Sequence, residues 1–460
     1  MTHEGDRTVS VPTSPVTLRL PAVRALRQWR RDPIGLLTRA GSHGDVVRLR
    51  LPRLEAWLLN HPDLVRDVLV AGHHVFMKGP TMQAAKHVLG ESLLTGEGEF
   101  HRQQRRLIQP IFHQARLQAH ADVMVEHTDR QMRAWQAGDP IDVHAEMAQL
   151  TLSIVGKSLF GADVETAEAR AIGRALRESL ALFGRVFSPL FPVWRRLPAP
   201  SIRRLHRAQA VLDATIHRMI RERRAAPEPG SDLLSLLLSA RDEGREGMSD
   251  RQVRDEAMTL FLAGHETTAV ALTWTWYLLS QHTEVEHRLH QEVDQVLAEG
   301  PATVEDIPRL RYTAMVLRES MRVRPPAWAI GRRALAEHPV PGAVIPAGAV
   351  VVVSPYLVHH DERWWPDPEA FVPERWEDHD REDRPRLAYF PFGAGPRMCV
   401  GEPFAWMEAV LVLATMARRW RLRLQPGHRM GIEPSITLRP RNGMPMIPEA
   451  RAARFGTDWN

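Results

Sequence analysis

The chain has 460 residues, of which 44% are hydrophobic and 25% are charged, and it contains one cysteine. This composition excludes disordered and fibrous chains, and a single thiol excludes a disulfide framework and dithiol redox chemistry. The formal net charge of +5 comes mostly from arginines that are interspersed with acids. Because nucleic-acid binding needs a basic stripe or a recognition motif, we expect no nucleic-acid partner.

The first thirty residues show no secretory signal, since no basic flank precedes an apolar core. Apolar stretches along the chain fall well short of the roughly 20 residues of a spanning helix, so we expect no transmembrane segment and a cytoplasmic protein. No linker, repeat or low-complexity tract divides the sequence. We therefore expect an N-terminal extension over residues 1–30 and a single domain over residues 31–460.

The N-terminal half begins with strand-like runs and continues with helical periodicity. Asp45–Arg50 and Glu55–Leu59 are strand-like runs, and residues 115–225 carry apolar pairs at three- and four-residue spacing. The arginine-rich stretch Leu18–Leu37 suggests either contact with a membrane surface or a solvated face, and the density of charges favours the solvated face.

The C-terminal half contains a second helical block, a short strand-rich part and a final helix. The block runs from Ser249 to about residue 323 and opens on a predicted capping box. Further on, Val344–Gly348 reads as a turn and Ala349–Val353 as a buried strand, and the last helix begins near Glu402. These elements predict a mainly α fold with a small β-rich portion.

Polar residues interrupt the otherwise apolar second block at Ala263–Thr268. A helix that is apolar all round runs through a protein core. Gly264 there costs about 1 kcal/mol relative to alanine, and the buried carboxylate of Glu266 requires partners. Such local violations indicate a functional site, and the alternative is an exposed polar turn on one helix face.

The single cysteine, Cys399, is bracketed by glycines and lies just before the helix expected near Glu402. Free N–H groups and the dipole at a helix N-terminus favour a thiolate over a thiol. A thiolate held open by glycines next to a cation suits axial ligation of a flat metal cofactor. The alternative is a buried, inert cysteine.

The stretch around this cysteine resembles the heme-binding loop of the cytochrome P450 family, whose pattern is F-x-x-G-x-R-x-C-x-G. The fixed positions are filled by Phe392, Gly395, Arg397, Cys399 and Gly401. The resemblance implies the cytochrome P450 fold and a heme b cofactor, iron protoporphyrin IX, with Cys399 as the ligand of its iron.

The polar interruption of the second helical block resembles the family's oxygen-binding motif, A-G-x-E/D-T. It is matched by Ala263, Gly264, Glu266 and Thr267. The resemblance implies that Gly264 leaves space for dioxygen and that Glu266 passes protons inward. It also implies that the Thr267 hydroxyl bonds to a carbonyl one turn back. His265 occupies the variable position, and we assign it no catalytic role.

Two further motifs follow in family order. Glu319 and Arg322 match E-x-x-R, and Arg375 lies in a P-E-R-W segment that is similar to the family's P-E-R-F. The resemblance implies a buried structural network of these three charges. It also implies cations for the heme propionates. Those cations are Arg397, the W/H-x-x-x-R pair His101 and Arg105, and the strand arginine Arg332.

The resemblance spans residues 30–445 and leaves no room for a fused reductase. It implies a monooxygenase that uses O2 and receives electrons from NAD(P)H through a separate ferredoxin reductase and ferredoxin. Arg102, Arg105 and Arg106 are candidates for a basic face that docks an acidic ferredoxin. Alternatives are a peroxide-driven fatty-acid oxidase, an oxidative coupling enzyme of the same site, and a heme-thiolate gas sensor.

The segments that the family uses for substrate recognition are rich in apolar residues. They imply a lipophilic small molecule, for which we favour a terpenoid-like skeleton in bacterial natural-product metabolism over a fatty acid, macrolide or aromatic peptide. The segments are Met77–Leu94, Leu180–Phe191, Leu260–Ala263, Ala327–Ile330 and Ser435–Thr437. Candidate pocket residues are Phe261, Trp328, Ile330 and Ile436.

Overall fold

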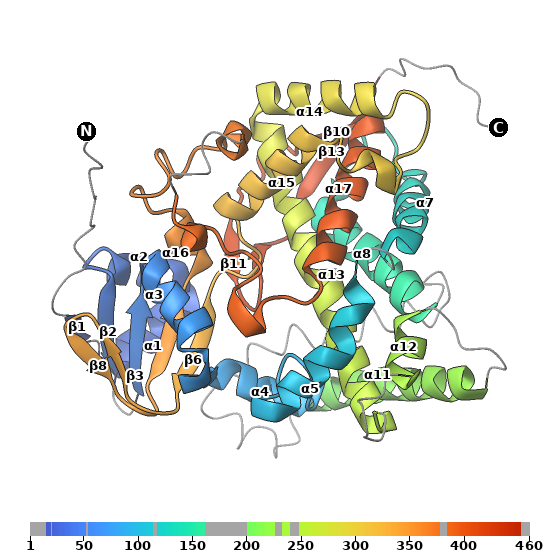
Figure 1. Cartoon of the computed structure of the whole chain (residues 1–460). Coiled ribbons are helices and arrows are strands. Elements are labelled where there is room, and N and C mark those ends of the chain that lie inside the picture. Colours follow the sequence, from blue (N-terminus) through green and yellow to red (C-terminus); the bar gives the residue numbers. More distant parts are fainter. Residues whose placement is uncertain are drawn as a thin grey trace, which may run out of the picture. The chain divides into compact units, whose positions relative to one another are not determined.

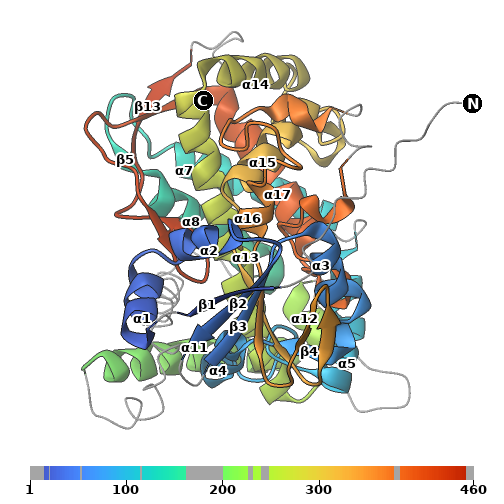
Figure 2. The ribbon, with the colours of Figure 1, turned by 90° about the vertical axis from the view of Figure 1, so that its left-hand side faces the viewer.

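The computed structural model describes residues 15–19, 21–51, 54–113, 117–161, 200–225, 232–239, 248–377 and 384–451. The chain divides into two compact units (Figures 1 and 2). The sheet unit comprises Met1–Pro80, Ala329–Pro366 and Arg384–Met398. The helical unit comprises Thr81–Trp328, Asp367–Asp383 and Cys399–Asn460.

The sheet unit is built on six strands in the order β1-β2-β3-β9-β6-β4. Figure 2 shows β1, β2 and β3 lying side by side. The pairs β1–β2 and β3–β9 are parallel, and the other pairs are antiparallel. The strands are β1 (Val16–Arg19), β2 (Val46–Leu51), β3 (Leu54–Leu59), β4 (Phe76–Lys78), β6 (Ile330–Ala334) and β9 (Val350–Val353). The predicted strands near residues 45–50, 55–59 and 349–353 are confirmed.

A small hairpin of the sheet unit corrects one prediction. Val344 and Ile345 lie in β8 (Ala343–Ile345), which pairs with β7 (His338–Val340), and not in a turn. The second half of the predicted turn is present, since Ala347 and Gly348 form a turn before β9 and Gly348 has a φ of 85°. The hairpin itself reverses at Gly342, whose φ is 71°. The buried Ile345 side chain shows why an extended conformation wins for these β-branched residues.

The core of the sheet unit includes Trp57, Leu59, Val65, Val351 and Val353. The unit also contains short helices and helical turns. These are α1 (Ala22–Arg31), α2 (Pro33–Gly41), α3 (Pro62–Arg66), α16 (Pro355–His359), the π-helical turn η1 (Asp67–Ala71), and the 3-10 turns η2 (His73–Val75), η8 (Arg386–Ala388) and η9 (Gly395–Arg397).

The helical unit contains the long helices, and the fold as a whole is mainly α with small β-sheets, as predicted. Its helices are α4 (Pro80–Leu89), α5 (Gly98–Ile108), α7 (Ala121–Met132), α8 (Val143–Phe160), α11 (Pro200–Ala225), α12 (Leu233–Ser239), α13 (Asp250–Gln281), α14 (Thr283–Val296), α15 (Arg311–Val323) and α17 (Glu402–Arg419). Its 3-10 turns are η3 (Gln109–Phe112), η4 (Gln118–His120), η5 (Val304–Asp306) and η6 (Pro373–Trp376).

Two small antiparallel sheets complete the helical unit, in the orders β10-β13-β5 and β11-β12. Their strands are β5 (Ile141–Asp142), β10 (Trp420–Leu424), β11 (Ile432–Pro434), β12 (Leu438–Pro440) and β13 (Pro445–Ala450). Residues 162–199 of the predicted helical block lie outside the described part of the chain.

Helix α13 is the axis of the helical unit and packs against α8, α15 and α17 (Figure 1). Its N-cap is Ser249, and the predicted capping box with Gln252 is present. Trp274 and Trp276 are fully buried, as expected for a helix that is apolar on most faces. Within the described ranges, no helix is both long enough and apolar enough to cross a membrane.

Candidate functional site

Cys399 lies on the turn that precedes α17, where Gly401 is the N-cap residue and Pro403 stands in the first turn. The backbone N–H groups of Gly401 and Glu402 hydrogen-bond to the sulfur and favour the thiolate, as predicted. The residue is solvent-accessible, yet protein atoms crowd around the sulfur. Desolvation therefore outweighs the N–H groups and raises the pKa of the Cys399 thiol.

Arg105 is the cation that the structure brings to this sulfur. It lies on α5 one turn after His101, which is buried. Burial lowers the pKa of Arg105, and the negative charge of an ionised Cys399 opposes that shift. The Arg105 Nε donates a hydrogen bond to Gln109 Oε1 at 3.3 Å. The helical unit thus places a cation next to a thiol whose anion needs one.

The residues that precede the cysteine belong to the sheet unit. Arg397 ends the 3-10 turn η9, and Gly395 begins it with a φ of 69°. A Cβ atom on Gly395 would lie 2.1 Å from the carbonyl oxygen of Leu69, so only glycine fits against η1. Phe392 is half-buried. Arg332 is buried on β6 with its Nη1 donating to the Gly331 carbonyl oxygen at 3.1 Å.

The middle of α13 presents one accessible stripe on an otherwise buried helix. Ala263 is exposed and Thr267 is half-buried. The Thr267 Oγ1 donates a hydrogen bond to the Ala263 carbonyl oxygen at 2.8 Å, which is the one-turn-back bond expected from the motif. These two residues are one helical turn apart and share a face.

Gly264 lies where α13 approaches α8. A Cβ atom there would lie 3.0 Å from Val155 Cγ2 on α8. The missing side chain therefore permits close approach of the two helices, and the expectation that it leaves space for dioxygen stays a prediction. The sequence pattern could not distinguish these two uses of a helical glycine.

Glu266 is buried and fully engaged. Thr437 Oγ1 donates to its Oε1 at 3.0 Å, Arg439 Nε donates to the same oxygen at 2.5 Å, and His265 Nε2 lies 4.0 Å from Oε2. Burial alone would raise the pKa of Glu266, but Arg439, His265, His144 and Thr437 together lower it. No signal in the sequence linked Arg439 to Glu266, because 173 residues separate the two.

Glu319 and Arg322 form a fully buried bidentate pair on α15, with N–O distances of 2.9 and 2.8 Å. Arg375 Nε lies 3.4 Å from Glu319 Oε1, so the structure brings the three charges together. Trp376 Nε1 also donates to Glu319 Oε2 at 3.0 Å. The tryptophan in place of the family's phenylalanine therefore supplies a hydrogen bond that phenylalanine cannot make.

Glu408 on α17 is a buried carboxyl that sequence reasoning missed. Desolvation raises its pKa well above the ordinary value, and the Thr268 hydroxyl opposes that shift. Burial therefore favours the neutral form of this carboxyl group. Its position directly before the apolar run Ala409–Ala417 did not indicate that the carboxyl group is buried.

The candidate pocket residues divide between the two units. In the helical unit, Phe261 and Trp328 are buried, and the indole Nε1 of Trp328 donates to the Ser435 carbonyl oxygen at 2.9 Å. That bond brings Ala327–Trp328 and the segment around Ile436 together. Ile330 is half-buried on β6 of the sheet unit. Leu180–Phe191 lies outside the described residues.

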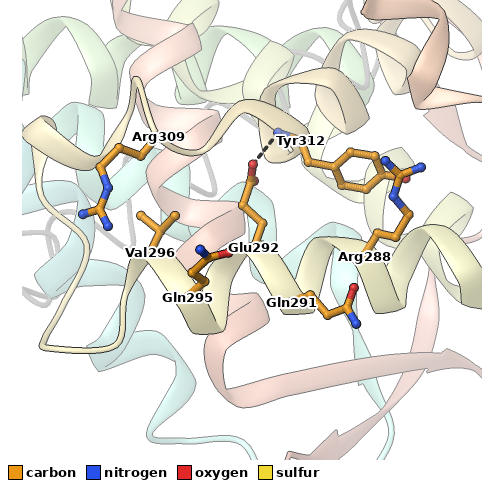
Figure 3. A pocket seen from close by; sticks show the side chains of 7 residues that line it. All are labelled: Arg288, Gln291, Glu292, Gln295, Val296, Arg309 and Tyr312. Carbon is orange, nitrogen blue, oxygen red and sulfur yellow. Dashed lines mark hydrogen bonds between the residues drawn. The ribbon is translucent and has the colours of Figure 1, made fainter.

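A polar groove with a volume of about 440 Å³ lies between α14 and the start of α15 (Figure 3). Its Glu292 accepts hydrogen bonds from the backbone N–H groups of Tyr312 at 2.6 Å and Thr313 at 2.8 Å. Arg288 pairs with Glu374 and lies 4.4 Å from the centroid of the Tyr312 ring. Glu292, Arg288 and Tyr312 of this groove thus tie α14, α15 and η6 together.

The family model for cytochrome P450 matches residues 17–445. The chain belongs to the cytochrome P450 family. As a member, it is a heme-thiolate oxidoreductase of the monooxygenase class, as the sequence motifs predicted.

Curated relatives and solved structures agree with this assignment. Cyclooctatin synthase of Streptomyces melanosporofaciens is 39% identical and is matched over 92% of both chains. Cyclooctat-9-en-7-ol 5-monooxygenase of the same organism is 39% identical over 87% of each chain, and pentalenene oxygenase of Streptomyces avermitilis is 34% identical over 88% of this chain and 90% of that protein. The crystal structure of the cytochrome P450DA heme domain, 23% identical, superimposes with a TM-score of 0.87 over 96% of this chain and 99% of that chain, which shows the shared fold.

The donor groups around Cys399 fit a heme. The sulfur is a soft ligand. Two backbone N–H groups and Arg105 are placed to stabilise its anion. The raised pKa describes the thiol of the protein chain without a metal. Coordination to a metal removes the proton from a thiol, so this raised pKa does not oppose heme binding.

Proposed function

We propose that this cytochrome P450 inserts one oxygen atom from O2 into a lipophilic, terpenoid-like small molecule in natural-product metabolism. The names of three relatives support this class, since they refer to cyclooctatin, cyclooctat-9-en-7-ol and pentalenene. Buried apolar residues at the candidate pocket positions, Phe261 and Trp328, also support it. Shape and apolar contact would orient such a substrate.

The residues proposed to hold the heme are those of the motif. Cys399 would ligate the iron, and the N–H groups of Gly401 and Glu402 would help to stabilise its thiolate. Arg105, His101, Arg332 and Arg397 bind the propionates through charge-assisted hydrogen bonds. Bound in this way, the heme supplies the activation of O2.

The polar stripe of α13 would handle the protons of the reaction. Arg439 holds Glu266 ionised, so this carboxylate could accept a proton and pass it toward Thr267. The Thr267 hydroxyl, which donates to the Ala263 carbonyl oxygen, would be the hydroxyl that α13 presents at the site of O2 activation. The pairing of an accessible Thr267 with a buried, ionised Glu266 is the observation that carries the proposal.

Electrons would come from NAD(P)H through a separate ferredoxin reductase and ferredoxin. Arg102 and Arg106 are exposed on α5 and suit an acidic partner. Glu99 pairs with Arg102 and lies 3.8 Å from Arg106, so part of this basic charge is compensated. The cytoplasmic location and the single domain over residues 31–460 remain part of the proposal.

The decisive experiment is Cys399→Ser. Because the variant lacks the thiolate, we expect loss of the thiolate-type band in the carbon monoxide difference spectrum of the reduced protein. We also expect loss of product formation with NAD(P)H and ferredoxin proteins. Met398→Leu, at the neighbouring exposed residue, is the matched control and should keep the band. A Cys399→Ser protein that still gave the thiolate band would refute the proposal.

A further inference from the structure

The turn that follows α4 is held at three consecutive residues by the first half of α13. Glu91 N donates to Asp255 Oδ2 at 2.9 Å, and Leu93 N donates to Glu256 Oε1 at 2.8 Å. Between these two, Thr259 Oγ1 donates to Ser92 Oγ at 2.7 Å. Thr259 lies four positions after Asp255 and three after Glu256, so it neighbours both carboxyl side chains on the helix surface.

The backbone of this turn is shaped to fit that face. Gly90 has a φ of 71°, and a Cβ atom there would lie 2.1 Å from the carboxylate carbon of Asp255. Ser92 and Thr95 are fully buried. The Thr95 hydroxyl donates to the Gly90 carbonyl oxygen at 2.7 Å and accepts from Ser92 N at 3.0 Å. The turn is therefore closed on itself as well as bonded to α13.

The two carboxyl groups have different neighbours. Asp255 pairs with Arg254 at 2.7 Å, and Arg254 also pairs with Asp213 of α11. Glu256 forms no ion pair with a cation among the residues that the structure describes. Burial, with a smaller contribution from the charge of Asp255, raises its pKa to about 8 against the opposing bond from Leu93 N. On the side of the turn, Lys86 pairs with Glu91 at 3.0 Å.

These contacts join two segments that we expect to line the substrate pocket. Leu93 lies at the end of Met77–Leu94, and Thr259 directly precedes Leu260–Ala263. We propose that Asp255, Glu256 and Thr259 are positioning residues that latch Gly90–Leu93 onto α13 and thereby fix the shape of the substrate pocket. This inference rests on the proposed function. The latch makes the site select rigid, compact lipophilic molecules over flexible chains.

The test is Glu256→Leu in the heme-loaded protein, with Glu256→Gln as the rescue variant, since glutamine keeps a neutral side chain and the Oε1 acceptor. Without an acceptor for the buried Leu93 N–H, hydrogen exchange at Leu93 should accelerate about 10- to 100-fold. The ratio of dissociation constants for lauric acid and pentalenene, measured from the spin-state shift, should fall about tenfold. Glu256→Gln should restore both values. Glu284→Leu, at an exposed position of α14, is the matched control.

Unchanged exchange and an unchanged ratio in Glu256→Leu would overturn the latch, as would a Glu256→Gln protein that behaves like Glu256→Leu. If Glu256→Leu does not fold, Thr259→Val carries the test, because it removes one hydroxyl and should accelerate exchange at Ser92. The thiolate-type band separates the two proposals. A variant that keeps the band but shows no change in selectivity refutes the latch and leaves the monooxygenase assignment intact.

Discussion

Glu256 and Glu266 lie on the same helix, both are buried, and their pKa values move in opposite directions. Burial, with a smaller contribution from the charge of Asp255, raises the pKa of Glu256 to about 8 against the opposing bond from one backbone N–H. Glu266 faces Arg439 and the Thr437 hydroxyl, so it is ionised. Burial is common to both. The neighbouring charge therefore decides which carboxyl fixes a structure and which one can exchange protons.

The largest effect should come from removing the charge that distinguishes the two sites. Arg439→Met leaves Glu266 buried without its cation, and we expect a loss of about 3–5 kcal/mol in the free energy of unfolding at pH 7. The pKa of Glu266 should then rise, as that of Glu256 does. Urea unfolding measures the loss, and Arg439→Met/Glu266→Gln should recover most of it. A loss below about 1 kcal/mol would mean that the pair of Arg439 with Glu266 contributes little to the stability of the folded protein.

The second prediction removes the ionisable group itself, at Glu256, by the substitution Glu256→Gln. Because the pKa of Glu256 is raised, the native state keeps a proton that the unfolded state releases above about pH 4.5. Its contribution to stability is therefore present below that pH and is lost as the pH rises to about 8. We expect Glu256→Gln to be more stable than the native protein by about 4 kcal/mol at pH 8 and about equally stable at pH 4.5. Thermal unfolding at the two pH values measures this difference, and equal pH dependence of the two proteins would contradict it.

The smallest effect on stability should come from Thr267→Val, next to Glu266. The hydroxyl bond to Ala263 adds little to a helix that already satisfies that carbonyl, so we expect a change of less than about 1 kcal/mol. Product formed per O2 consumed should nevertheless fall. Thr273 makes the same bond to the Ala269 carbonyl oxygen in the fully buried part of α13, so Thr273→Val is the matched control. Equal coupling in the two variants would show that the position of the hydroxyl on α13 does not matter.

Local features of the sequence were predictable. The capping box at Ser249, the start of α17 after Cys399 and the bond from Thr267 to Ala263 all involve residues within one helical turn. So does the ion pair of Glu319 with Arg322. In these cases the spacing along one helix brings the groups together. The order of the motifs along the chain then indicated the family.

What could not be predicted depends on contacts between distant segments. The raised pKa of Glu256 requires the turn at Leu93, and the ionised state of Glu266 requires Arg439. The use of Gly264 depends on Val155 of α8. Only the assembled helical unit supplies these neighbours, so periodicity and motif spacing carry no trace of them.

The contact of Gly395 with the Leu69 carbonyl has a consequence for the order of folding. It joins the start of η9 to the π-helical turn η1, and most of the chain lies between the two. The entropy of closing so long a loop must be lost before the contact can form, whereas helices form from local contacts, so this contact forms late. The approach to Cys399 can therefore take its final course only after the sheet unit has assembled. Cofactor capture should accordingly follow the main folding transition and should not nucleate it.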